Sequence, residues 1–232
     1  MSKKSYYKVA LVAAILSAVS WIVFILGSMS RPALSDISDP LQFFQTIQDT
    51  RLVWIMYGWG GIFGTLLSIP YIIAFYYAMK DTGPGILMSM VIALIGATLT
   101  LFGFFSPLTT LYYYLPVGLV ANPESLPVFK AAAEVAVQVF EAPWFVGSFL
   151  IFGLGFGLIA YFGLRTSTGP KWLNVVGILA GLTGIIWLEN FLPFLQPIGV
   201  ILRLSNILLI FIWSIGLSTA LVRQKEPAIQ LN

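Results

Sequence analysis

The sequence predicts an all-α integral membrane protein with six transmembrane helices. Of its 232 residues, 59% are hydrophobic and only 9% are charged, and the mean hydropathy is +0.93. Soluble domains carry about 25% charged residues. Six charge-free windows run along the chain; four comfortably exceed the roughly 18 residues needed to cross a bilayer, and the last two lie close to that length. One transmembrane domain over residues 1–232 is therefore expected, with no room for a separate soluble domain.

The crossing segments are expected to be helices rather than strands. Bilayer hydrocarbon offers backbone groups no water, so stretches this apolar must satisfy their hydrogen bonds internally. No ten-residue stretch alternates polar with apolar residues, which excludes the pattern of a membrane β-barrel. The predicted spans lie at about 9–28, 52–79, 86–107, 144–164, 172–193 and 198–222.

The first span is followed by a short amphipathic segment. Lysines before residues 9–28 make this span resemble a secretory signal, but its apolar run exceeds the usual length of about 7 to 15 residues, so we expect a retained helix. Residues 38–50 carry apolar and polar side chains on opposite sides of a helix, with Ser38 or Asp39 available as the N-cap before Pro40. This segment is predicted to lie at the outer surface or to cap the bundle.

The second and third spans look like a copy of the fourth and fifth. The turn Thr82-Gly83-Pro84 recurs as Thr168-Gly169-Pro170, 86 residues further along the chain, and Gly61 and Gly147 match at the same offset. We interpret this similarity as an internal duplication of a helical hairpin. Both copies run in the same direction, a form of repeat that occurs in some transporters.

A second amphipathic segment is predicted at residues 124–142. Lys130, Glu134, Gln138 and Glu141 fall at i, i+4, i+8 and i+11, which places one narrow polar stripe on an otherwise apolar helix. Like the segment at 38–50, it is expected to lie at the outer surface or to cap the bundle. Surface loops with helical turns are the alternative for both segments.

Small residues at four-residue spacing recur within the spans. They place only small side chains on one face of the helix, which lets two helix backbones approach closely. In a chain with 21 glycines this spacing is common by chance, and internal packing is favoured over an oligomer face or a ligand groove. The pairs are Gly60 and Gly64, Gly153 and Gly157, Gly177 and Gly181, and Ala180 and Gly184.

Only two charged residues fall deep within the predicted spans. Glu189 and Arg203 lie seven residues before and seven after position 196, so an antiparallel hairpin brings them to one level. They are expected to pair, because an unpaired arginine at mid-bilayer costs about 2.5 to 3.5 kcal/mol. The alternatives are Arg203 reaching the outer headgroups, or a ligand-binding or proton-handling polar site that also includes Asn190 and Asn206.

The charges at the span ends predict an orientation. Eight of the 12 basic residues gather on the side that holds both termini, so the positive-inside rule places both termini in the cytoplasm of a cell-membrane protein. Trp54, Trp59 and Trp144 near the opposite ends fit an interfacial aromatic belt. The eight are Lys3, Lys4, Lys8, Lys80, Arg165, Lys171, Arg223 and Lys225; the other four are Arg31, Arg51, Lys130 and Arg203.

The composition excludes several classes of chemistry. The chain contains no His and no Cys, so we expect no metal site, haem, iron–sulfur cluster or other cofactor. No histidine base, cysteine nucleophile or HExxH motif is available, and no catalytic residue is assigned. The basic residues are too scattered for a nucleic-acid surface. The expected partners are membrane lipids, with a lipophilic ligand or another membrane subunit as further candidates.

A glycine-rich stretch carries a family resemblance. A span that ends in Tyr161-Phe162-Gly163-Leu164-Arg165 is followed by Gly169-Pro170-Lys171-Trp172-Leu173 and by a further glycine-rich span from Gly177. This pattern resembles the prokaryotic six-span membrane family filed as domain of unknown function 4386, most strongly over residues 144–187. The resemblance implies a bacterial or archaeal membrane protein of about this size. It brings no activity, so no residue inherits a role from it.

Three function hypotheses follow. The first is a non-catalytic membrane component that binds lipid or a lipophilic ligand, or serves as an accessory subunit of a membrane complex. The second is a small transporter or channel whose path is lined by the polar site around Glu189, although the inner helix halves offer only scattered polar residues. The third is an outer-leaflet lipid-modifying enzyme, which requires Asp36, Asp39, Glu134 or Glu141 to converge on Glu189.

Overall fold

The computed structural model describes residues 3–224, and every regular element in that range is helical. Six helices are long and apolar enough to cross a membrane, which confirms the predicted fold class and the number of crossings. Lys225, which entered the charge pattern, lies outside the described residues. The six run over Lys4–Ser30, Arg51–Thr82, Pro84–Val120, Leu126–Arg165, Lys171–Leu188 and Pro193–Arg223.

The first two crossings flank a short amphipathic helix. The segment predicted at 38–50 is helical as α2, and α3 and α4 together form the second crossing, with a break at Leu67. The bounds are α1, Lys3–Ser30; a 3₁₀ turn, Leu34–Asp36; α2, Pro40–Asp49; α3, Arg51–Leu66; and α4, Ser68–Met79, followed by a 3₁₀ turn, Lys80–Thr82.

The third and fourth crossings are unusually long helices that pack antiparallel. Each contains a proline, Pro107 or Pro143, and each widens into a π-helical turn a few residues later. A proline removes one backbone donor without ending the helix when neighbouring elements hold the backbone in place. The bounds are α5, Pro84–Thr109; π, Thr110–Tyr114; α6, Leu115–Val120; α7, Leu126–Ser148; π, Phe149–Gly155; and α8, Phe156–Arg165.

The last two crossings form a shorter hairpin. α9, Lys171–Thr183, continues into a 3₁₀ turn, Gly184–Leu188. A second 3₁₀ turn, Pro193–Ile198, leads into α10, Gly199–Arg223. At about 1.5 Å per residue, the 18 residues from Lys171 to Leu188 rise roughly 27 Å, close to the thickness of bilayer hydrocarbon.

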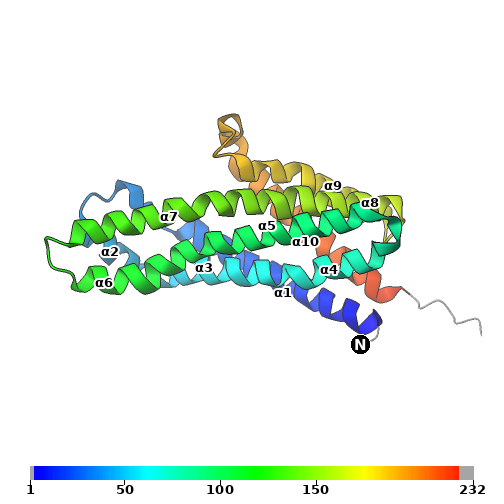
Figure 1. Ribbon diagram of the computed structural model, residues 1–232, viewed down its shortest axis with the longest axis horizontal. Coiled ribbons are helices and arrows are strands. Elements are labelled where there is room, and N and C mark those ends of the chain that lie inside the picture. The colour runs from blue at the N-terminus through cyan, green and yellow to red at the C-terminus, as the bar shows by residue number, and fades with distance from the viewer. Residues whose placement is uncertain (1–2, 225–232) are drawn as a thin grey trace, which may run out of the picture.

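The two long helices extend well beyond that thickness at one end of the molecule (Figure 1). Their 37 and 40 residues rise roughly 55 and 60 Å, against about 30 Å of hydrocarbon. The projecting part has its own hydrophobic core, separate from the core between the crossings. This second core is formed by Phe43, Phe44, Ile47, Trp54, Leu111, Leu115, Leu126 and Ala133.

This projection corrects the expected placement of residues 124–142. They are helical, but they do not form a separate helix lying along a surface; they are the first turns of the 40-residue helix that continues to Arg165. The third span likewise runs past its predicted end at Pro107 as far as Val120. Packing of α6 and α7 against α2 supports the helices beyond the predicted ends.

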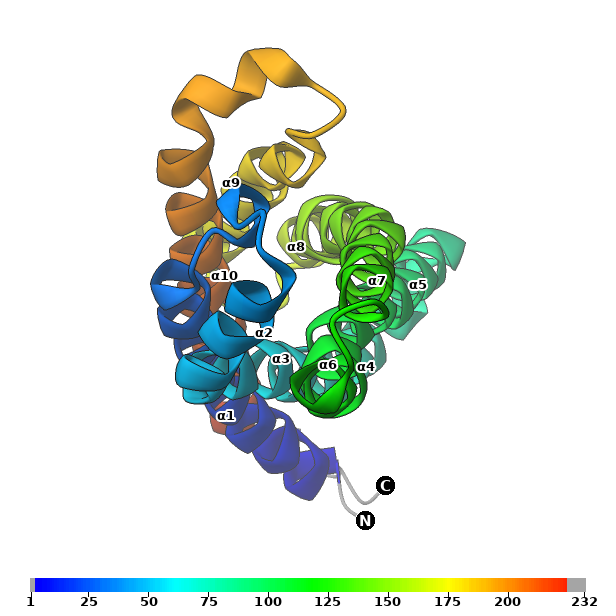
Figure 2. The same ribbon diagram turned by 90° about the vertical axis from the view of Figure 1, so that its left-hand side faces the viewer.

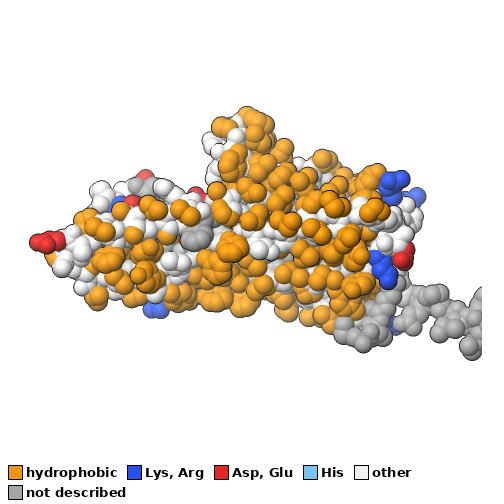
Figure 3. All heavy atoms as spheres, viewed as in Figure 1, with side chains coloured by type: hydrophobic (Ala, Val, Ile, Leu, Met, Phe, Trp, Pro, Cys, Tyr) orange, Lys and Arg blue, Asp and Glu red, His pale blue; other side chains and the backbone are white. Residues whose placement is uncertain are grey.

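Charged side chains gather toward the two ends of the molecule, and hydrophobic side chains cover the middle (Figure 3). The turns from α4 to α5 and from α8 to α9 carry Lys80, Arg165 and Lys171, and α10 ends at Arg223; we call this the basic end. The opposite, projecting end carries Glu124 in the turn between α6 and α7, and we call it the acidic end.

The two turns at the basic end each contain a glycine with positive φ. Gly83 has φ of 113° and Gly169 has φ of 74°, values in the left-handed region that glycine adopts without strain. A duplicated hairpin predicts this correspondence. The outward helices differ in length, however, because α5 continues through α6 to Val120 while the helical path from Lys171 ends at Leu188.

Close glycine contacts join the fourth crossing to the fifth. A Cβ placed on Gly181 lies 2.5 Å from the Cα of Gly157, and one placed on Gly184 lies 2.5 Å from the Cα of Gly153. Gly60 on α3 similarly meets the backbone of Phe24 on α1, at 2.7 Å from its nitrogen. These small residues serve internal helix packing, as the sequence indicated.

Two of the three tryptophans expected in an aromatic belt lie inside the bundle. Trp54 is only 1% exposed, and the Trp144 ring packs against Trp187 with ring centroids 5.7 Å apart. Trp59, at 38% exposure, fits the expected surface position. The belt prediction is wrong for Trp54 because it packs with residues of α2 and α7 in the second core, and for Trp144 because it packs against Trp187.

Candidate functional site

The predicted pairing of the two deep charges is present in the structure. Arg203 Nη1 on α10 lies 2.6 Å from Glu189 Oε1, just after the 3₁₀ turn that ends α9. The Glu189 side chain is 8% exposed and that of Arg203 is 34% exposed, so a buried carboxylate meets a partly open guanidinium. The carboxylate also packs on Gly199, where a Cβ would lie 2.4 Å from Glu189 Oε2.

The two asparagines differ in their surroundings. Asn206 is fully buried; its Oδ1 accepts a hydrogen bond from Trp187 Nε1 at 2.9 Å, and its Nδ2 donates to the Ala180 carbonyl at 2.7 Å. Asn190 is exposed in the connection between the last two crossings. The four predicted residues therefore divide into an ion pair, a buried helix–helix link and a surface amide, an arrangement suited to holding α9 against α10.

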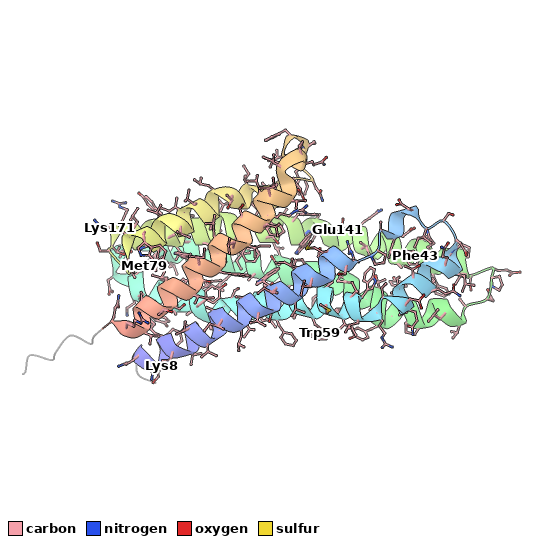
Figure 4. The ribbon with its side chains drawn as sticks, turned by 180° about the vertical axis from the view of Figure 1, so that it is seen from behind. Lys8, Phe43, Trp59, Met79, Glu141 and Lys171 are labelled. Carbon is pink, nitrogen blue, oxygen red and sulfur yellow. The ribbon has the colours of Figure 1, made fainter. Side chains whose placement is uncertain are left out.

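A larger polar feature lies at the acidic end. A cavity of about 550 Å³ separates the connection after α1, together with α2 and α3, from α7. Figure 2, which looks onto this end, shows that connection and α7 on opposite sides, and Figure 4 labels Phe43 and Glu141 in the same region. The lining residues are Arg31, Pro32, Ala33, Leu34, Phe43, Trp54, Glu134, Val137, Gln138 and Glu141.

One wall of the cavity is basic. Arg31 directly follows the last residue of α1, and its guanidinium carbon lies 4.6 Å from the ring centroid of Tyr57 and 5.4 Å from that of Trp54. These cation–π contacts fix the position of the guanidinium. Within residues 3–224, Arg31 has no carboxylate within ion-pair distance.

The facing wall is acidic and belongs to α7. The polar stripe that the sequence showed, including Glu134, Gln138 and Glu141, lines the cavity. Lys130 Nζ lies 2.7 Å from Glu134 Oε1 and 5.5 Å from the ring centroid of Phe43, so Glu134 is neutralised within the wall. Glu141 has no such ion pair in the described part of the chain.

The carboxylates do not converge on Glu189, contrary to what the lipid-modifying enzyme required. Glu134 and Glu141 line the cavity with Arg31, and Glu189 is not part of its lining. Asp39 caps α2, since its carboxylate accepts hydrogen bonds from the Leu41 and Gln42 backbone N–H groups at 3.2 and 3.3 Å. Asp36 is exposed in the preceding turn.

Compared with protein-family models, curated proteins and solved structures, the chain gives no match. The resemblance of residues 144–187 to a six-span prokaryotic family stays a prediction. Across residues 3–224, no group of three or more Asp and Glu side chains is positioned to hold a metal ion. The arrangement at the acidic end offers charged and hydrogen-bonding groups for binding.

Proposed function

We propose that this multi-pass membrane protein is a non-catalytic component that binds an amphiphilic, lipid-like ligand in the cavity at its acidic end. The observation that carries the proposal is a cavity of about 550 Å³ with Arg31 on one wall and Glu134 and Glu141 on the other. Cavities of about 300 to 1,000 Å³ with a few convergent polar groups are typical small-molecule sites. The membrane lipids and lipophilic ligands expected from the sequence belong to this class.

The surroundings of the cavity favour a ligand with an apolar part. Val135 and Val139 lie on α7 about a quarter of a turn from the polar stripe, and they are 56% and 60% exposed. The apolar surface of the crossings therefore continues alongside the cavity. A polar headgroup in the cavity and a hydrocarbon chain along this surface satisfy both environments.

Transport has less support. The Glu189–Arg203 pair is closed at 2.6 Å, and both sides of the Asn206 amide are bonded within the protein. A pocket between the crossings, lined by residues that include Ser17 and Ser214, measures only about 10 Å³. That volume holds about one water molecule and gives no support to a route for a solute.

We further propose that the acidic end faces the outside of the cell membrane and that both termini are cytoplasmic, since the basic end collects Lys80, Arg165 and Lys171.

The chain has no cysteine, so single-cysteine variants report one position each. Glu124→Cys is expected to react with an impermeant maleimide in intact cells, and Ser167→Cys only after permeabilisation. Ser167 is exposed, whereas neighbouring Thr168 is buried. The reverse labelling pattern contradicts this orientation.

The binding proposal predicts a retained ligand. Protein extracted gently from its own membrane is expected to carry an amphiphile in native mass spectrometry, and the double variant Arg31→Gln/Glu141→Gln is expected to lose most of it. A matched double variant, Arg51→Gln/Glu124→Gln, removes the same charges from exposed positions outside the cavity and should retain it. The proposal is contradicted if both double variants retain equal amounts of amphiphile, or if the wild-type protein carries none.

A further inference from the structure

The geometry of the cavity points to a chemical class for its ligand, an inference that rests on the proposed function. We infer that the cavity takes a phospholipid headgroup that carries both a phosphate and a primary ammonium group. Three observations carry the inference: an arginine on one wall and a carboxylate on the other, neither of which has an ion pair among residues 3–224, and aromatic faces that are already covered.

Arg31 is the group that binds the phosphate. Its guanidinium is partly buried, has no ion pair among residues 3–224, and is held over the rings of Tyr57 and Trp54. A guanidinium presents parallel N–H donors that match two phosphate oxygens, and an arginine held in place by ring contacts loses little further freedom on binding. Arg31 follows the end of α1 directly, at the level where a crossing ends and lipid phosphates lie.

Glu141 is the group that binds the ammonium. Lys130 neutralises Glu134, which leaves Glu141 as the cavity carboxylate without a cation among the described residues. The positive charges of Arg31 and Lys130 equal the negative charges of Glu134 and Glu141, so these four side chains have no net charge. A zwitterionic headgroup keeps this balance, whereas a headgroup with only a phosphate adds an uncompensated negative charge near Glu141.

The aromatic residues argue against a choline headgroup. Quaternary ammonium groups are recognised by open aromatic faces. The aromatic lining residues, Phe43 and Trp54, are 2% and 1% exposed, and Lys130 and Arg31 lie over their rings at 5.5 and 5.4 Å. A primary ammonium group instead donates hydrogen bonds to the carboxylate of Glu141. The cavity therefore favours an ethanolamine over a choline headgroup.

The experiment is a competition among lipids that differ only in the headgroup. Delipidated protein in detergent receives an equimolar mixture of phosphatidylethanolamine, phosphatidylcholine and phosphatidylglycerol with identical acyl chains, and native mass spectrometry counts the adducts. Wild-type protein is expected to prefer phosphatidylethanolamine over phosphatidylglycerol about tenfold, which matches the loss of one charge-assisted hydrogen bond. Glu141→Gln, which preserves side-chain shape, should reduce the preference to within about twofold. Glu124→Gln, at an exposed position, should leave it unchanged.

The outcomes separate this inference from the proposed function. Equal binding of all three lipids, with loss of all three in Arg31→Gln, overturns the headgroup assignment and leaves lipid binding intact. Lipid binding that neither Arg31→Gln nor Glu141→Gln alters places the lipid elsewhere and overturns both. Displacement of the lipid by an equal concentration of soluble phosphoethanolamine overturns the assignment of a lipid as the ligand. Thermal melting of each variant verifies that the protein tested is folded.

Discussion

Replacing Gly181 with leucine is expected to prevent recovery of folded protein. A Cβ at this position lies 2.5 Å from the Cα of Gly157 and 2.9 Å from the carbonyl oxygen of Gly153, both of which are backbone atoms. Overpacking costs about 1 to 3 kcal/mol where side chains can move aside. Here α8 and α9 must separate, so the cost approaches the total stability of a domain, about 5 to 15 kcal/mol.

The yield of monodisperse protein after detergent extraction measures this effect, together with its melting temperature. Gly181→Ala is expected to be intermediate, because even a single methyl group meets the backbone of α8. Leu182→Ala is the matched control, since Leu182 is the next residue and 67% exposed on the lipid-facing side. Wild-type yield and melting temperature for Gly181→Leu contradict the close α8–α9 contact.

Arg203→Ala is expected to give the second-largest loss of stability. The substitution leaves the Glu189 carboxylate 8% exposed and without the guanidinium that lies 2.6 Å away in the native protein. Removing one partner of a buried pair costs about 3 to 5 kcal/mol, and because Arg203 is 34% exposed we expect about 1 to 3 kcal/mol. Thermal unfolding in detergent should register this loss as a lower melting temperature.

A double-mutant cycle isolates the interaction between the two residues. Glu189→Ala is expected to cost less in the Arg203→Ala background than in the wild-type protein, because the charge that it removes is then already unpaired. Arg51→Ala, at an exposed position outside the pair, controls for loss of a positive charge. Melting-temperature shifts that simply add in the double variant indicate that the pair contributes no coupling.

The sequence predicts the crossings better than it predicts where the helices end. Charge-free windows identify all six crossings because bilayer hydrocarbon imposes the same requirement on each of them. The predicted third span ends at residue 107, yet the helix continues through a π-helical turn to Val120. The continuation depends on contacts of the projecting part, such as the Gly118 backbone against Phe44, and these join segments distant in the sequence.

The polar residues were likewise predictable where sequence-local geometry brings them together, and not where distant segments meet. Glu189 and Arg203 lie symmetrically in one hairpin, so local geometry brings them together. The stripe on α7 was visible as helical spacing, but its facing partner was not, because Arg31 belongs to a distant crossing. Trp54 appeared to be a surface residue, and only the packing of α2 and α7 turns it into part of a cavity wall.

The long helical path from the α6–α7 turn into the crossings has a practical consequence for imaging. With a mass of 25.5 kDa, the protein offers little contrast of its own to electron microscopy. α7 runs without interruption from Leu126 through its π-helical turn into α8. A soluble domain inserted between Asn122 and Ser125 is therefore connected to the crossings by a continuous helix. Such a graft supplies an alignment landmark outside the detergent micelle and leaves the cavity residues unaltered.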